Sequence, residues 1–405
     1  MDEQWYQNYV LLALRLDKIL RSQSAQPFVD AYYGPSAWKT QVESEREVPL
    51  DNIIKLAADL RTSLSSQQYT AAHQRHLEKQ LRALETVARK LNGEDFTLQE
   101  EVQNCFDISP RWIPEAEFEQ AHSWLDEILP GAGDISTRAL AWRKRYELPQ
   151  EKYYLLPQLV ELMIAEARAR TSAFVDLPPE EKIEVRVVRG KPTGGACWYL
   201  GNYQSLIEIN ADLPIALNTL LDLICHEGYP GHHTEATLKE LHLYRKQGYL
   251  DQSVLPLISP LCLIAEGIAT LAKEVIFSAE EAEKWLAQHI YPQVGLTIEP
   301  IDAEKFAQAS DILEGVRGNA AFLLREGRSE AEVRQYIQKY MLVSEDRADK
   351  ALQFLKVPFL DAYVFTYFYG KKLMRPWLEG PDKLKVFRRF LSEQIVPSDL
   401  VALSS

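Results

Sequence analysis

The sequence predicts a mainly α-helical fold that contains one small β-hairpin or sheet. Three observations favour this class. Apolar residues recur at three- and four-residue spacing along most of the chain, the stretch 183–210 alternates apolar with polar residues, and neither a fixed-period repeat nor a low-complexity tract interrupts the pattern. With 405 residues, 46% of them hydrophobic, the chain can bury a large core.

The helical pattern dominates the first part of the chain. We expect helices there at 3–22, 50–66, 70–92, 114–128, 134–146 and 150–171. Tyr33-Gly34-Pro35 and Pro130-Gly131 mark loops without forming a flexible linker. We therefore divide the chain into an N-terminal helical layer, 1–175, and a catalytic region, 176–405, with one integrated domain as the alternative.

The pattern changes at 183–210, where IEVRVVRG and SLIEIN alternate apolar with polar residues. KPTGGACWYLGNYQ separates them and contains the turn-forming Gly194-Gly195, so a hairpin or small sheet is expected. Helices are predicted again at 214–229, 233–248, 257–277, 279–290, 302–325, 329–340, 354–379 and 382–394.

Charge and hydropathy exclude two classes of partner. The net charge is −13, with 58 acidic against 45 basic residues, so no basic stripe is available for a phosphate backbone and nucleic acid is not expected as a partner. No run approaches the roughly 20 apolar residues that span a bilayer, and the aromatic stretch FLDAYVFTYFYG contains Asp361. A membrane role is not expected either.

Cysteine usage and the N-terminus favour a cytoplasmic location. The four cysteines form no CxxC pair, which is typical of reduced thiols rather than of a disulfide framework or a cysteine-based zinc site. The apolar stretch near the N-terminus is interrupted by Arg15 and Asp17, so we interpret it as an amphipathic helix and not as a signal peptide.

The most informative stretch is LLDLICHEGYPGHHTE, residues 220–235. His226 and Glu227 end an apolar helix and offer a metal ligand beside a carboxylate that can take a proton from water. Position 230, where the usual second ligand would stand, is proline. Residues six apart point about 240° apart around a helix, so His226 and His232 can share an ion only if the helix deforms. A two-residue bulge at Pro230-Gly231 would achieve this, because proline lacks an N–H and glycine permits unusual backbone angles.

Other candidate ligands rank lower. His233, seven residues after His226, would point in nearly the same direction around a regular helix, but it would lie about 10 Å further along the axis. His242 is expected to be a surface or core histidine. Cys225 should point about 100° away from His226, so a buried thiol is favoured over a fourth ligand.

A third ligand is expected downstream, because a catalytic zinc has three protein ligands and one open position. The helix LCLIAEGIATLA, 261–272, carries a single carboxylate, Glu266, which would be costly to bury without a partner. Gly267 beside it suits close packing beneath the motif helix. His226, His232 and Glu266 are therefore the predicted ligands of a Zn²⁺ ion.

These motifs resemble a known family. HEGYPGH at 226–232, followed by Ala265-Glu266-Gly267, is similar to the bacterial domain-of-unknown-function family numbered 885, whose pattern is HExxPGH with a later EGWA-like segment. That family is grouped with the gluzincin peptidases. The resemblance implies the same three zinc ligands, Glu227 as general base, and a multi-helix zincin-like (gluzincin-type) fold with an active-site cleft.

The resemblance extends to a later helix and has departures. YVFTYFYGK at 363–371 is similar to the family's Y-x-x-G helix, which implies that Tyr367 stabilises the developing oxyanion; an ordinary core aromatic is the alternative. The segment DAYYGP at 30–35 is a weaker N-terminal similarity to the same family. Ile268 replaces the family's tryptophan and Lys273 its later acidic residue, which affects the substrate pocket more than metal binding.

The expected function is that of a zinc metallopeptidase acting on oligopeptides. A strand at Gly195–Tyr199 or Ser205–Asn210 could pair with an extended substrate, although a purely structural sheet is equally compatible. Arg317 and Arg375 could anchor a substrate carboxylate, with solvent-facing arginines as the alternative. Two other functions compete: a metal-dependent amidase on non-peptide substrates, and a non-catalytic helical binding protein with a residual zinc site, which would not need Glu227.

Overall fold

The computed structural model describes residues 3–23, 27–191, 194–212 and 214–401. The predicted helical class is confirmed, because 67% of the residues lie in helices and 8% in strands. The helices of the first half are α1 (Glu3–Gln23), α2 (Ser36–Ser44), α3 (Leu50–Ser63), α4 (Ala71–Leu91), α5 (Leu98–Phe106), α6 (Glu115–Ile128), α7 (Ile135–Lys144) and α8 (Leu156–Ser172).

Most of these helices match the apolar periodicity, and the exceptions have local causes. The helix expected at 150–171 begins late, because Gln150–Leu155 forms a 3₁₀ segment and Pro157 lies in the first turn of α8. The short helix α2 was not predicted. Neither was α5, although its sequence carries a capping box in which the Thr97 hydroxyl and the Glu100 carboxylate satisfy each other's backbone N–H groups.

The second half adds twelve helices within the described residues. They are α9 (Leu217–Glu227), α10 (His232–Lys239), α11 (Pro260–Ile276), α12 (Ala279–His289), α13 (Ala303–Glu314), α14 (Val316–Arg325), α15 (Glu330–Met341), α16 (Glu345–Lys356), α17 (Leu360–Tyr363), α18 (Phe365–Met374), α19 (Lys383–Ser392) and α20 (Pro397–Val401).

Two long helices predicted in this half are wrong as single elements. The helix expected at 302–325 is divided at Gly315 into α13 and α14. The one expected at 354–379 is divided too, because α16 ends at Lys356, just before Pro358. Phe359 then adopts a left-handed backbone (φ 68°) and starts α17 in a new direction.

The hairpin or small sheet predicted at 183–210 is confirmed as a three-stranded sheet. β2 (Lys182–Val188), β3 (Gly195–Gly201) and β4 (Gln204–Asn210) lie in the order β2-β4-β3, with β2 parallel and β3 antiparallel to β4. The expected Gly194-Gly195 turn is wrong, because the hairpin turns at Asn202-Tyr203, both with positive φ. Of the intervening segment, Pro192 and Thr193 lie outside the described residues.

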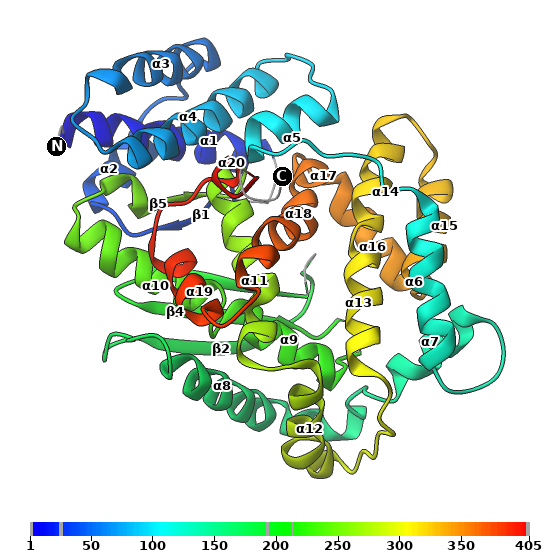
Figure 1. Ribbon diagram of the computed structural model, residues 1–405. Helices are drawn as coiled ribbons and strands as arrows, with labels where there is room; N and C mark the ends of the chain where they lie inside the picture. Colours follow the sequence, from blue (N-terminus) through cyan, green and yellow to red (C-terminus); the bar gives the residue numbers. More distant parts are fainter. Residues whose placement is uncertain (1–2, 24–26, 192–193, 213, 402–405) are drawn as a thin grey trace.

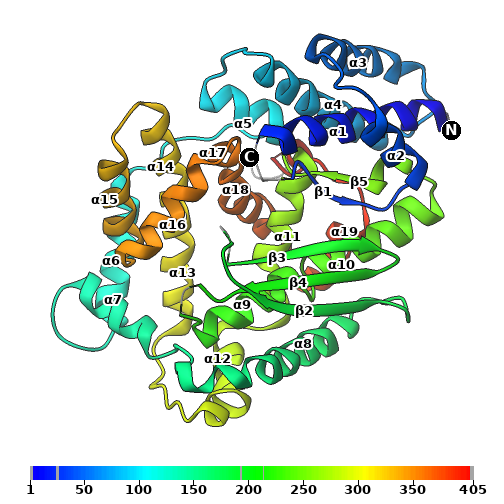
Figure 2. The same cartoon turned by 180° about the vertical axis from the view of Figure 1, so that it is seen from behind.

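A second, two-stranded sheet connects the two halves of the chain. β1 (Val29–Tyr32) pairs antiparallel with β5 (Val254–Pro256). In Figures 1 and 2 these strands lie between the helices α1–α4 and the three-stranded sheet, while α8 and α12 lie at the opposite end of the molecule. The domain division at residue 175 stays a prediction, but this pairing crosses it.

Helix α11 runs through the centre of the molecule and is almost entirely buried. It packs closely on α18, because a Cβ built on Gly370 would lie 2.7 Å from the Cα of Gly267. Neither position has room for a side chain, and a Cβ on Gly267 would meet the Gly370 carbonyl. α11 does pack on the motif helix, α9 (Leu217–Glu227), as expected, but the close approach at Gly267 is to α18.

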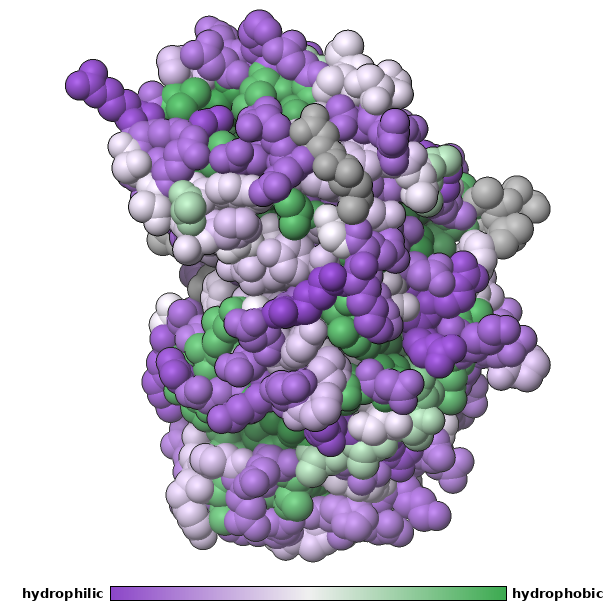
Figure 3. Space-filling view, turned by 90° about the vertical axis from the view of Figure 1, so that its left-hand side faces the viewer, coloured by the Kyte–Doolittle hydropathy of each residue, from purple (hydrophilic) through white to green (hydrophobic). Residues whose placement is uncertain are grey.

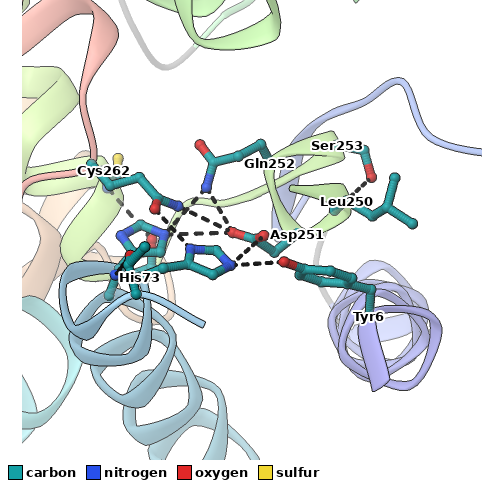
Figure 4. A network of polar contacts seen from close by, with 11 residues as sticks. Tyr6, His73, Leu250, Asp251, Gln252, Ser253 and Cys262 are labelled. Atoms are coloured by element: carbon teal, nitrogen blue, oxygen red, sulfur yellow. Dashed lines mark hydrogen bonds and ion pairs between the residues drawn. The ribbon is translucent and has the colours of Figure 1, made fainter. Parts of the chain in front are cut away.

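A buried polar network fixes the segment before β5 (Figure 4). His73 of α4 lies 2.9 Å from the Tyr6 hydroxyl and, through the same Nε2 atom, 3.4 Å from Asp251. Gln252 donates to the Asp251 carboxylate at 2.7 Å. Because buried polar groups are costly unless they interact, this network ties α1 and α4 to the segment that leads into β5.

No helix in the described part of the chain is long and apolar enough to cross a membrane. On the face drawn in Figure 3, apolar residues appear as separate small areas among hydrophilic ones.

Candidate metal centre

The motif helix breaks where the sequence places Pro230 and Gly231, and it breaks completely. α9 ends at Glu227, the Tyr229–Pro230 peptide is cis, and His232 is the first residue of α10. The predicted two-residue bulge in a continuous helix is therefore wrong; two helices meet at this loop. Gly231 is required because a Cβ there would lie 1.9 Å from the carbonyl oxygen of His226.

The break brings the three predicted ligands together. One ligand atom from each of His226, His232 and Glu266 lies within 4.8 Å of the others. His226 Nε2 is 3.3 Å from Glu266 Oε2, and His232 Nε2 is 3.7 Å from Glu266 Oε1. Two ligands held about 2.1 Å from a tetrahedral ion are separated by about 3.4 Å, so these spacings suit one shared zinc.

The chemistry of the group also fits a cation. Glu266 is buried, and its Oε2 atom has no hydrogen-bond partner among the residues that the structure describes, although His226 Nε2 lies 3.3 Å from it. Such an orphaned carboxylate oxygen is rare in a folded protein and is what a metal ligand looks like before the ion binds. Two imidazoles and one carboxylate are also the donor set of many catalytic zinc sites.

Electrostatics differ sharply between the two histidines. Burial lowers the pKa of His232 to about 4, so this imidazole is neutral and ready to bind a metal at neutral pH. For His226 burial also lowers the pKa, but the adjacent Glu266 carboxylate and the charge of Glu227 outweigh it and raise the pKa to about 9. A metal would have to displace the proton of His226, so its binding is expected to release a proton.

Glu227, the predicted base, lies beside the triad on the last turn of α9. Its side chain is buried, and burial together with the charge of Glu266 raises its pKa to about 7. A backbone hydrogen bond from Cys197 of β3 acts in the opposite direction. A carboxylate with a pKa near the working pH is well suited to accept and return a proton.

Tyrosines enter the site from the two short helices α17 and α18. The ring of Tyr367 lies 6.4 Å from that of His226, and its hydroxyl has a pKa raised well above the usual value by burial and by the charge of Glu266. The sequence did not single out Tyr363, whose hydroxyl donates to Glu266 Oε1 at 2.5 Å. The one sequence feature that could have pointed to Tyr363 is its position in the motif, four residues or about one helical turn before Tyr367.

His233 lies outside the triad and belongs to a second network that holds the loop. Its Nε2 is 3.0 Å from Glu181 and its Nδ1 is 2.8 Å from the Ser205 hydroxyl. Tyr229, on the other side of Pro230-Gly231, donates to the same Glu181 carboxylate, and Arg168 binds its second oxygen. Glu181 thus clamps the residues on both sides of the turn that presents His232.

The remaining candidates do not belong to the group of His226, His232 and Glu266. Cys225 is fully buried and is not part of the triad, and burial raises the pKa of its thiol. His242 is half-buried, with a pKa lowered by burial. Arg317 is exposed. Arg375 is not free to bind a substrate carboxylate, because it forms ion pairs with Asp311 and Glu274.

The triad opens into a cavity of about 850 Å³. Its wall includes the run Gly195–Tyr199 of β3, which is an edge strand because β4 pairs with only one of its sides. Tyr363 and Tyr367 also line the cavity. The cavity is large enough for several residues of an extended peptide.

Comparison with protein-family models and with curated proteins gives no match for this chain.

Proposed function

We propose that the chain is a zinc-dependent metallopeptidase that hydrolyses oligopeptides. The observation that carries the proposal is the meeting of His226, His232 and Glu266 within 4.8 Å, in a cavity that Glu227 also lines. A structural metal site needs no general base, whereas a hydrolase does. The resemblance of HEGYPGH and the later Glu266-Gly267 pair to family 885 supports the same function.

Each residue of the site has one task in this reaction. A zinc ion bound there supplies Lewis-acid polarisation of the substrate carbonyl and a lowered pKa for water. Glu227 takes the proton of the attacking water and returns it to the leaving amine. Tyr367 donates a hydrogen bond to the oxygen that becomes negative. Tyr363 holds Glu266 through its hydrogen bond and so fixes the third ligand.

The shape of the cavity supports a peptide as the substrate. The backbone of an edge strand has free N–H and C=O groups, and an extended peptide can add to it as a further strand. Residues Gly195–Tyr199 offer such an edge beside Glu227, and Cys197 already donates its backbone N–H to that carboxylate. We therefore assign β3 as the strand along which the substrate backbone lies.

Replacement of the base tests this function. Glu227→Gln keeps the shape of the side chain but cannot accept a proton, so peptide turnover should fall by about 10²-fold or more while zinc content and melting temperature stay near those of the parent. Glu45→Gln, a change of the same kind outside the cavity, serves as the control. Equal turnover by parent and Glu227→Gln would refute the assignment, and a zinc-loaded parent that cleaves no peptide in a broad library would refute the peptidase itself.

A further inference from the structure

Asp30 on β1 is an unpaired carboxylate in the wall of the same cavity. It lines the cavity together with Glu227 and Glu266, although more than 190 residues separate it from them in the chain. The side chain is partly accessible, and its carboxylate forms no hydrogen bond or ion pair with any residue that the structure describes. Nothing in the proposed hydrolysis uses it.

The lysines of the cavity wall are already paired with acidic residues. Every lysine among its described residues forms an ion pair: Lys239 with Glu235, Lys191 with Glu208 and Lys356 with Glu330. An incoming carboxylate, such as the C-terminus of a peptide, would therefore find no free lysine there. An incoming ammonium group would find Asp30 free, and such charge-assisted hydrogen bonds are about twice as strong as neutral ones.

The backbone around Asp30 is held in place on both sides. The N–H groups of Phe28 and Val29 donate to the Asp17 carboxylate at 2.9 and 3.0 Å. β1 pairs with β5, and the Tyr33 N–H donates to Ser253 beyond the strand at 3.0 Å. The network around Asp251 in turn fixes the segment that leads into β5 (Figure 4). A carboxylate on such a rigid strand is preorganised for binding.

We propose that Asp30 binds the α-ammonium group of the substrate, so that the enzyme removes residues from the N-terminus of peptides. This inference rests on the proposed peptidase function. Hydrolysis would add one water across the first peptide bond and release a free amino acid and the shortened peptide.

The position of Asp30 favours the α-ammonium over a lysine or arginine side chain. The α-nitrogen lies about 2.5 Å from the carbonyl carbon of its own residue, so in an aminopeptidase the group that binds it must lie beside the reacting centre. Asp30 shares the cavity wall with Glu227 and Glu266, and burial and then the charges of these two residues raise its pKa to about 7. A cation bound between these groups would relieve their mutual repulsion.

Matched peptides test the proposal. A tetrapeptide with neutral side chains is offered to the zinc-loaded enzyme with a free or an acetylated N-terminus, and a third peptide carries an acetylated N-terminus and an internal lysine. We expect the parent to cleave the free peptide at least about 30-fold faster than both acetylated ones, with a single amino acid as the first product seen by mass spectrometry. Asp30→Asn should lose most of this preference by slowing cleavage of the free peptide alone.

Binding provides a second readout that does not depend on turnover. Calorimetric titration of the metal-free protein should give tighter binding of the free peptide than of its acetylated form, and Asp30→Asn should abolish the difference. Glu208→Gln removes a charge from the same wall where Lys191 already neutralises it, so this control should keep the preference.

The outcomes separate the two proposals. If the parent cleaves free and acetylated peptides equally fast, or prefers the internal lysine, the role of Asp30 is refuted while the peptidase stands. If Asp30→Asn slows all three peptides equally, Asp30 does not recognise the ammonium group. If the zinc-loaded parent cleaves none of them and no other peptide, the peptidase fails and the inference fails with it.

Discussion

The contact between Gly267 of α11 and Gly370 of α18 links the packing of the fold to the chemistry of the site. α11 carries Glu266, and α18 carries Tyr367. A methyl group on Gly370 would lie 2.7 Å from the Cα of Gly267 and 2.8 Å from the carbonyl oxygen of Leu263, whereas ordinary contacts begin at 3.4 Å. Both obstacles are backbone atoms, so no side-chain rotation can relieve the overlap.

Gly370→Ala must therefore move the two helices apart by about 0.7 Å, the difference between 2.7 and 3.4 Å. Overpacking of this kind costs about 1–3 kcal/mol, whereas alanine in an unobstructed helix would stabilise it by about 1 kcal/mol. We expect a lower free energy of unfolding in urea and, because Tyr367 moves away from the metal ligands, slower peptide turnover. Gly194→Ala, whose Cβ would meet open space, is the control and should change neither by much. A Gly370→Ala protein as stable as the parent would refute the close contact and the reasoning built on it.

Two further predictions concern the histidines and the acids of the site. His232→Ala should weaken zinc binding by more than about 100-fold, whereas His233→Ala, which removes the contacts to Glu181 and Ser205 but no ligand, should weaken it by about 10-fold or less. A competition assay with a chelator measures both, and the reverse order would contradict the geometry. In the metal-free folded protein the pKa of Asp30 is raised from 3.8 to about 7. The folded state therefore binds the proton of the Asp30 carboxyl more tightly than the unfolded state does. The free energy of unfolding should fall as the pH rises between about 4 and 7. Asp30→Asn should show a smaller fall in melting temperature between pH 5 and pH 8 than the parent, and an equal fall would show that Asp30 does not titrate in this range.

Local chemistry was enough to select the three residues that the structure brings together. His226 and His232 could be chosen because proline at 230 forbids a regular helix, and Glu266 stood out as the one carboxylate in an apolar segment. The sequence predicted that the helix is distorted but not how, because Pro230-Gly231 is compatible with both a bulge and a full break.

The parts that could not be predicted depend on distant contacts. Asp30 reaches the cavity because β1 pairs with β5, a partner more than 220 residues away, and no local pattern specifies that pairing. Tyr363 reaches Glu266 because Phe359 turns the chain between α16 and α17, where the apolar periodicity predicted one long helix. The turn of the sheet was misplaced for a related reason: Gly194 and Gly195 favour a turn, but β3 begins at Gly195.

The metal content of the purified protein tests the central claim most directly. Elemental analysis of protein prepared without added metal should give about one zinc per chain for the parent and close to none for Glu266→Ala, because two histidines without the carboxylate leave the ion under-coordinated. Circular dichroism of the same samples checks that the variant remains folded. Zinc at full occupancy in a folded Glu266→Ala protein, or a parent that binds no zinc even when it is supplied, would contradict the account.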